Sequence, residues 1–153
     1  MKIGSINLNE NELQFKIIKN YFKSSSGILK VSKQINGKNV IDYEYLKNKM
    51  PFVINERPNI YGLYIKEENK EWEIKYIGQR KHKGILERLR QHIVGKHELT
   101  GSKLDNVNKA LESGFEIGVK LFLIRPDSMR LYYEEKLISN FDLEWNQQKH
   151  KLK

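Results

Sequence analysis

The residues of this chain that could do chemistry lie in two short motifs and one pair. Tyrosine and glycine occur together as Gly62-Leu63-Tyr64 and again as Tyr76-Ile77-Gly78. Arg88 and His92 follow four residues apart, so they lie one turn apart on a helix. Phenol and imidazole groups can relay protons, and a guanidinium can stabilise the charge that develops on a phosphate. This combination is typical of a phosphodiesterase site.

Glu134 is the most informative single residue. On a helix expected over 128–140, it falls within an apolar stripe that includes Leu137 and Phe141. A carboxylate on an apolar face costs several kcal/mol unless a cation or hydrogen-bond donors compensate it. Two interpretations remain open: an ion pair with a buried arginine, or a ligand for a divalent ion. Magnesium suits a single carboxylate, because waters and phosphate oxygens complete its coordination.

Ordinary structural roles could also account for these residues. Tyr64 and Tyr76 could be strand residues with exposed hydroxyls, since tyrosine favours strands. Arg88 and His92 could lie on the exposed side of an amphipathic helix.

The composition indicates a polyanionic partner. The formal net charge is +9, and nucleic acid is the leading candidate, with an anionic membrane surface as the alternative. The absence of cysteine excludes disulfides and thiolate metal sites. No apolar run approaches the roughly 18 residues of a membrane span, and the N-terminus lacks the apolar core of a signal peptide. We therefore expect a soluble, cytoplasmic protein whose partner is nucleic acid and not a membrane.

The elements that must position the motifs follow from periodicity and turn signals. Two strands are expected over 60–65 and 72–77, joined by the polar stretch 66–70. If they form a hairpin centred near Asn69, Tyr64 lies opposite Ile74, and Gly62, Tyr64, Ile74 and Tyr76 line one face. Helices are expected over 85–94, 102–113 and 128–140, with a third strand over 115–124.

Residues 1–58 differ in character from residues 59–153, and we expect a boundary near Arg57-Pro58. The first part predicts a helix over 10–23, a hairpin around Asn36-Gly37 and a short helix over 43–49 that ends before Pro51. Its lysines, among them Lys30, Lys33 and Lys38, could grip the backbone of a nucleic acid. The alternative is a structural cap on the second part.

Gly62-Leu63-Tyr64, Tyr76-Ile77-Gly78, Arg88-x-x-x-His92, Glu134 and Asn146 together resemble the motifs of the GIY-YIG nuclease superfamily, in the same order. The resemblance covers about residues 59–147. It implies an α+β fold with a small three-stranded antiparallel sheet flanked by helices. It also implies one Mg²⁺ on Glu134, for which Mn²⁺ could substitute. Tyr64, Tyr76, Arg88 and His92 would surround the scissile phosphate, and Asn146 would support the site from its edge.

The expected function is that of a divalent-metal-dependent DNA endonuclease, either a stand-alone restriction-type enzyme or one from a mobile element. Tyr64 is the expected general base, relaying its proton to His92, unless His92 takes the proton directly. We expect a basic loop that contacts phosphates through Arg80, Lys81 and Lys83.

Several alternatives stay open at this stage. RNA could be the substrate, and a homodimer would be needed for concerted cleavage of both strands. The main rival is a non-cleaving nucleic-acid-binding module that retains the fold. A third class is a structural basic protein in which Glu134 pairs with an arginine.

Overall fold

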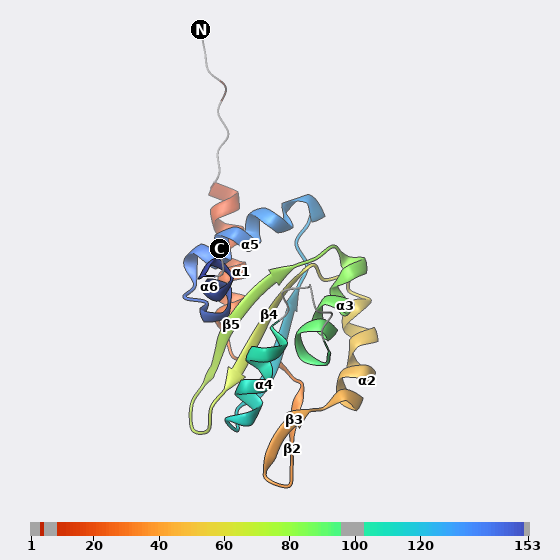
Figure 1. Ribbon diagram of the computed structural model, residues 1–153. Helices are drawn as coiled ribbons and strands as arrows, with labels where there is room; N and C mark the ends of the chain where they lie inside the picture. The colour runs from red at the N-terminus through yellow and green to blue at the C-terminus, as the bar shows by residue number, and fades with distance from the viewer. Residues whose placement is uncertain (1–3, 5–8, 96–102, 152–153) are drawn as a thin grey trace.

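The computed structural model describes residues 4, 9–95 and 103–151 (Figure 1). Helices and strands are mixed along these ranges. In chain order the elements are α1 (Asn9–Lys23), β1 (Leu29–Lys30), β2 (Ser32–Ile35), β3 (Lys38–Ile41), α2 (Tyr43–Ile54), β4 (Ile60–Lys66), β5 (Trp72–Gln79), α3 (His82–Ile93), α4 (Leu104–Glu112), β6 (Glu116–Phe122), the 3-10 turn η1 (Asp127–Met129), α5 (Arg130–Asn140) and α6 (Glu144–Lys151).

The central sheet has four antiparallel strands in the order β1-β6-β4-β5. We predicted an antiparallel sheet of three strands, and the three expected strands are its members β4, β5 and β6. The prediction of three strands is wrong because the short segment Leu29–Lys30 pairs with β6, with Leu29 opposite Val119. A separate two-stranded hairpin of β2 and β3 extends beyond the sheet (Figure 1).

Both expected hairpins are confirmed, and local residue chemistry explains their turns. Asn36 and Gly37 have φ values of 53° and 79°, the positive values that a tight two-residue hairpin turn requires. Between β4 and β5, Asn69 also has a positive φ, of 61°. Tyr64 pairs with Ile74, as predicted.

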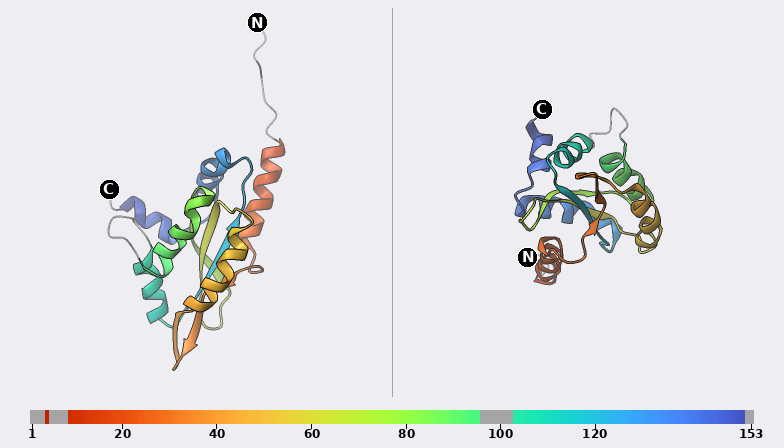
Figure 2. Two further views of the ribbon diagram at one scale, coloured as in Figure 1. Left: turned by 90° about the vertical axis from the view of Figure 1, so that its right-hand side faces the viewer. Right: turned by 90° about the horizontal axis from the view of Figure 1, so that it is seen from below.

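The two faces of the sheet carry two separate apolar cores, on opposite sides in Figure 2. One core lies under α2, α3 and α4 and includes Leu63 and Ile65 of β4. The other lies under α1 and α5 and includes Ile60 and Ile77. Residues of one strand alternate between the cores because successive side chains point to opposite faces. Figure 2, seen from below, shows α1 on one side of the sheet and α3 and α4 on the other.

An irregularity in β4–β5 decides which side chains share a face. The register runs from Leu63 opposite Tyr76 to Tyr64 opposite Ile74, so Lys75 is an extra residue on β5. Such a bulge reverses the facing of every residue beyond it relative to a regular ladder. Tyr76 therefore lies on the face of Leu63, and Tyr64 lies on the other face.

Residues 1–58 contribute to the same cores as the rest of the chain. Phe15, Ile18 and Phe22 of α1 pack with Ile60 and Ile77. Leu13 and Ile17 of the same helix lie outside this core, and their side chains are 61% and 58% exposed. The boundary near Arg57-Pro58 stays a prediction.

The helix that we expected to end before Pro51 continues to Ile54, so that prediction is wrong. Leu46 and Met50 hold this helix against the core, and the Asn55 amide bonds the Pro51 carbonyl at 3.2 Å. Packing compensates for the missing proline donor.

The helices predicted over 85–94, 102–113 and 128–140 correspond to α3, α4 and α5. Residue 102, where we expected the second of these helices to begin, lies outside the described residues. Among the helices described, none has the length and apolar character needed to cross a membrane.

Candidate active site

Tyr64 does not lie where we predicted. Its side chain belongs to the core under α1, and its hydroxyl donates a 2.6 Å hydrogen bond to the Phe22 carbonyl. Burial raises its pKa above the ordinary value. The prediction that Tyr64 and Tyr76 line one face is wrong, because the bulge separates them.

Tyr61 occupies the position expected for Tyr64. It lies on the face of Tyr76, and the two ring centroids are 6.1 Å apart. Gly78, opposite Tyr61 in the ladder, makes room for the phenol: a Cβ on Gly78 would overlap the Tyr61 hydroxyl. The second motif therefore needs its glycine because Tyr61 crosses over it.

Helix α3 brings Arg88 and His92 to these phenols. Both are buried, at 8% and 0% exposure, so the alternative that they are exposed surface residues is wrong. His92 Nε2 lies 2.9 Å from the Tyr61 hydroxyl, and its ring centroid is 5.1 Å from that of Tyr76. The Arg88 guanidinium lies close enough to both phenols for its charge to lower their pKa values. The one-turn spacing predicted from the sequence thus brings both side chains together. They form one cluster with Tyr61 and Tyr76.

The backbone fixes the tautomer of His92. The Lys103 amide donates to His92 Nδ1 at 2.9 Å, so Nδ1 carries no proton. The proton of a neutral His92 then lies on Nε2, which donates to the Tyr61 oxygen. His92 in this state cannot accept a proton from Tyr61 at the nitrogen that faces it.

Burial and charge set the protonation of the cluster. Burial lowers the pKa of His92 to about 3, and the positive charges of Arg88, Lys103 and Arg80 act in the same direction. Burial raises the pKa of Tyr61 and that of Tyr76, and Arg88 opposes this rise at both phenols. The cluster therefore holds a neutral imidazole and two phenols beside a guanidinium at neutral pH.

Glu134 reaches this cluster from α5. Its negative charge acts to raise the pKa of Tyr76, which places the carboxylate within electrostatic range of that phenol. The side chain is half-buried, while Tyr133 and Leu137 on the same helix make the buried contacts. Leu131, also on this helix, is 49% exposed. Glu134 thus lies at the edge of the core.

Asn146 holds the second motif from outside the sheet. Strand β5 is an edge strand, so Ile77 has a backbone amide and carbonyl without a neighbouring strand. The Asn146 side chain accepts from the Ile77 amide at 2.9 Å and donates to the Ile77 carbonyl at 3.0 Å. These two bonds fix the strand on which Tyr76 lies. Asn146 thus supports the site through the backbone of β5, and these two bonds do not involve the phenols.

The basic residues predicted to contact nucleic acid fall into two groups. Lys30 and Lys33 form ion pairs with Glu116 and Asp42, at 2.7 and 3.3 Å. Lys38 is exposed on the hairpin. Arg80, Lys81 and Lys83 lie where β5 ends and α3 begins, and all three are exposed.

Sequence reasoning missed Tyr61 and Lys103. Tyr61 lies two residues before Leu63 and therefore shares its face, which is a signal that the sequence contains. What the sequence does not show is the bulge that brings Tyr76 to that face. Lys103 acts through its backbone amide, which no side-chain motif can reveal.

Comparison with known proteins adds no assignment: no family model, curated protein or solved structure matches this chain.

Proposed function

We propose that this chain is a divalent-metal-dependent endonuclease that hydrolyses phosphodiester bonds of DNA and resembles the GIY-YIG nucleases. The observation that supports this best is the convergence of two phenols, a guanidinium and a neutral imidazole from three separate elements, with the Glu134 carboxylate in range. The resemblance rests on Gly62-Leu63-Tyr64; the segment Asn59-Ile60-Tyr61 offers an Ile-Tyr pair as well, with asparagine where the motif has glycine.

In the proposed reaction a water molecule attacks phosphorus while the bond to the 3′ oxygen breaks. Tyr61 first gives its phenolic proton to solvent, against the rise in pKa that burial causes, and the resulting phenolate takes the proton from the attacking water. The Nε2 proton of His92 and the Arg88 guanidinium both donate to that phenolate and stabilise it. Solvent protonates the departing 3′ oxygen. His92 acts in this scheme as a donor that orients Tyr61, because its tautomer leaves no acceptor facing the phenol.

Arg88 and Tyr76 complete the site on the phosphate. Arg88 is a planar donor whose charge can stabilise the phosphate oxygens in the transition state. Tyr76 donates to the phosphate or to the water and positions it. Both side chains are buried before substrate binds, so little reorganisation is needed at the moment of reaction.

Glu134 is the residue that would hold the magnesium ion. Within the part of the chain that the structure describes, no three His, Asp or Glu side chains gather into a site that could enclose an ion. A single carboxylate fits Mg²⁺, which retains waters and binds substrate phosphate. When bound, the ion supplies charge neutralisation at the phosphate and at the leaving oxygen.

A second candidate is a module that binds nucleic acid without cutting it. The observation that favours it is the near-complete burial of Tyr61 and His92, at 1% and 0% exposure, because a purely structural network is buried in the same way. Both candidates predict DNA binding, so only a cleavage assay separates them.

The decisive experiment is incubation of supercoiled plasmid with the protein and Mg²⁺ or Mn²⁺, with and without chelator. We expect nicking or linearisation by the parent chain and by Tyr64→Phe, and loss of cutting in Tyr61→Phe. The two tyrosines are matched controls, since both are buried strand residues with hydrogen-bonded hydroxyls. Cutting that depends on Tyr64 and not on Tyr61 would overturn this choice of base.

A second matched pair tests the carboxylate. Glu134→Gln should abolish cutting, whereas Glu135→Gln, at the next and exposed position of α5, should leave it unchanged. Undiminished cutting by Glu134→Gln contradicts the metal assignment. Binding by the parent without cutting, under every divalent ion tried, supports the non-cleaving module instead.

A further inference from the structure

A basic cavity lies at the end of the sheet, where β5 passes into α3 and β6 leaves the sheet. Its volume is about 490 Å³, and Arg57, Lys81, Lys83 and Arg125 line it. Asp127 is the acidic residue of its lining. This carboxylate already pairs with Arg130 and accepts a 2.9 Å hydrogen bond from Asn59. The charge that faces the cavity is therefore strongly positive.

The cationic side chains of this cavity form no ion pair with the residues that the structure describes. None of Arg57, Lys81, Lys83 and Arg125 takes part in the ion pairs found among the described residues, and all four are exposed. His82 also lines the cavity, and its buried Nδ1 makes no hydrogen bond to any described residue. Four like charges in one place repel one another, which an anion would relieve.

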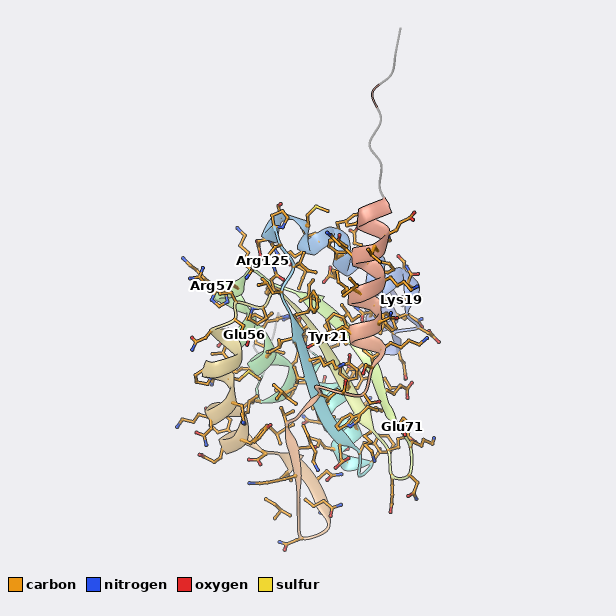
Figure 3. All side chains as sticks on the ribbon, turned by 180° about the vertical axis from the view of Figure 1, so that it is seen from behind. Lys19, Tyr21, Glu56, Arg57, Glu71 and Arg125 are labelled. Atoms are coloured by element: carbon orange, nitrogen blue, oxygen red, sulfur yellow. The ribbon has the colours of Figure 1, made fainter. Side chains whose placement is uncertain are left out.

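A second cavity of about 710 Å³ adjoins the first and shares Arg57, Leu123 and Arg125 with it. Figure 3 shows Arg57 and Arg125 near each other at this end of the sheet, with Glu56 below them. Together the two cavities make a hollow that begins at α3 and continues past the end of β6. A hollow of this length suits an extended chain better than a single small ion.

The backbone around the two arginines is fixed. Arg57 has a φ of 60°, a left-handed conformation that a non-glycine residue adopts only where its surroundings hold it. The Asn59 side chain holds the segment that carries Arg125. Its Nδ2 donates to the Ile124 carbonyl at 3.0 Å, and its Oδ1 accepts from the Ile124 backbone amide at 2.8 Å. These contacts set where the two arginine side chains leave the backbone.

Arg80 links the hollow to the candidate active site along the chain. Arg80, directly before Lys81, is close enough to Tyr61 and His92 for its charge to act on both. A line of positive charge therefore runs from the phenols through Arg80 and Lys81 to Arg57 and Arg125. Positive charge along such a line can neutralise the phosphates of a nucleic-acid strand.

We propose that this hollow binds the sugar-phosphate backbone of the substrate strand next to the bond that is cut, with Arg57 and Arg125 contacting successive phosphates. The inference rests on the proposed function for the identity of the substrate. Contacts of this kind position the strand and do not read its sequence. The hollow is thus a positioning surface for a phosphodiester chain.

The test is a salt titration of DNA binding in the presence of chelator, so that no strand is cut. The probe is a short duplex of random sequence, compared between the parent chain and the double variant Arg57→Asn/Arg125→Gln. Asparagine is chosen because it tolerates the left-handed backbone. The control Lys70→Gln/Lys109→Gln removes the same charge from exposed sites outside both cavities. Urea unfolding of each variant verifies the fold.

We expect the slope of log affinity against log salt to fall by about 1.8 in the arginine variant, which is about 0.9 for each lost phosphate contact. The control should keep the parent slope. A second set of duplexes has one fixed sequence, whose cut position is first mapped with the parent chain and Mg²⁺, and carries single neutral methylphosphonates. In chelator the parent should lose affinity when the methylphosphonate lies beside the mapped cut, and the arginine variant should not. Equal slopes in parent and arginine variant overturn the inference.

Two further outcomes separate this inference from the proposed function. If the salt dependence of binding falls in the arginine variant and the parent does not cut, the nuclease proposal is overturned and the binding surface is supported. Cutting by the parent with a normal slope in the arginine variant overturns the surface alone. Binding to phosphatidylserine vesicles that needs Arg57 and Arg125, without DNA binding, overturns the nucleic-acid partner.

Discussion

The neutral state of His92 predicts a specific loss of stability in mild acid. In the folded chain its pKa is about 3, against 6.5 for an ordinary histidine. Between these values the unfolded chain binds a proton that the folded chain does not bind. Stability from this residue is therefore complete above pH 6.5 and falls as the pH drops toward 3.

The size of the effect follows from this shift. At pH 5 the unfolded histidine lies about 1.5 pH units below its pKa, and each unit is worth about 1.4 kcal/mol, which gives a loss of about 2 kcal/mol relative to pH 8. His92 remains neutral in the folded chain at pH 5, so proton binding stabilises only the unfolded chain. For a chain of this size, such a loss is a large part of total stability.

The assay is urea unfolding of the parent chain and of His92→Gln across pH 8 to 5. Glutamine does not titrate, so the difference between the two curves removes the contribution of the carboxylates. We expect the free energy of unfolding of the parent to fall by about 2 kcal/mol more than that of the variant. Two parallel curves, or a ring-proton resonance of His92 that titrates near pH 6.5 in the folded chain, refute the reasoning.

Three further predictions follow from the same geometry. Gly78→Ala should displace the Tyr61 phenol and reduce plasmid cutting by at least about tenfold, whereas Gly84→Ala, which meets open space, should not. Asn146→Ala leaves two backbone groups of an edge strand unsatisfied and should lower the free energy of unfolding in urea by about 2–4 kcal/mol. Lys120→Met removes donors to two carbonyls at the end of α1 and should lower the melting temperature, and an unchanged value would contradict this.

Much of the fold could be predicted from the sequence because local signals are strong. The Asn36-Gly37 pair and the apolar alternation on either side predict a hairpin, and the structure has it. The stripe that includes Ile85 and Leu89 predicts α3 with its buried face. Each of these signals depends only on residues that are neighbours in the chain. The side-chain periods of strand and helix therefore suffice to predict the element from it.

Other parts of the fold were not predictable in this way. The pairing of Leu29 with Val119 joins residues far apart in sequence, and a strand of two residues carries no period. The continuation of α2 through Pro51 depends on core contacts of the helix, which outweigh the local cost of proline.

For the candidate site, the sequence by itself determined which side chains are available and that Arg88 and His92 share one side of a helix. Only the tertiary structure decided which tyrosine joins them. One extra residue at Lys75 moves Tyr76 to the face of Tyr61 and leaves Tyr64 against α1. The physical reason is that strand side chains alternate with a period of two, so a single inserted residue exchanges the faces, and no local propensity fixes where the insertion occurs.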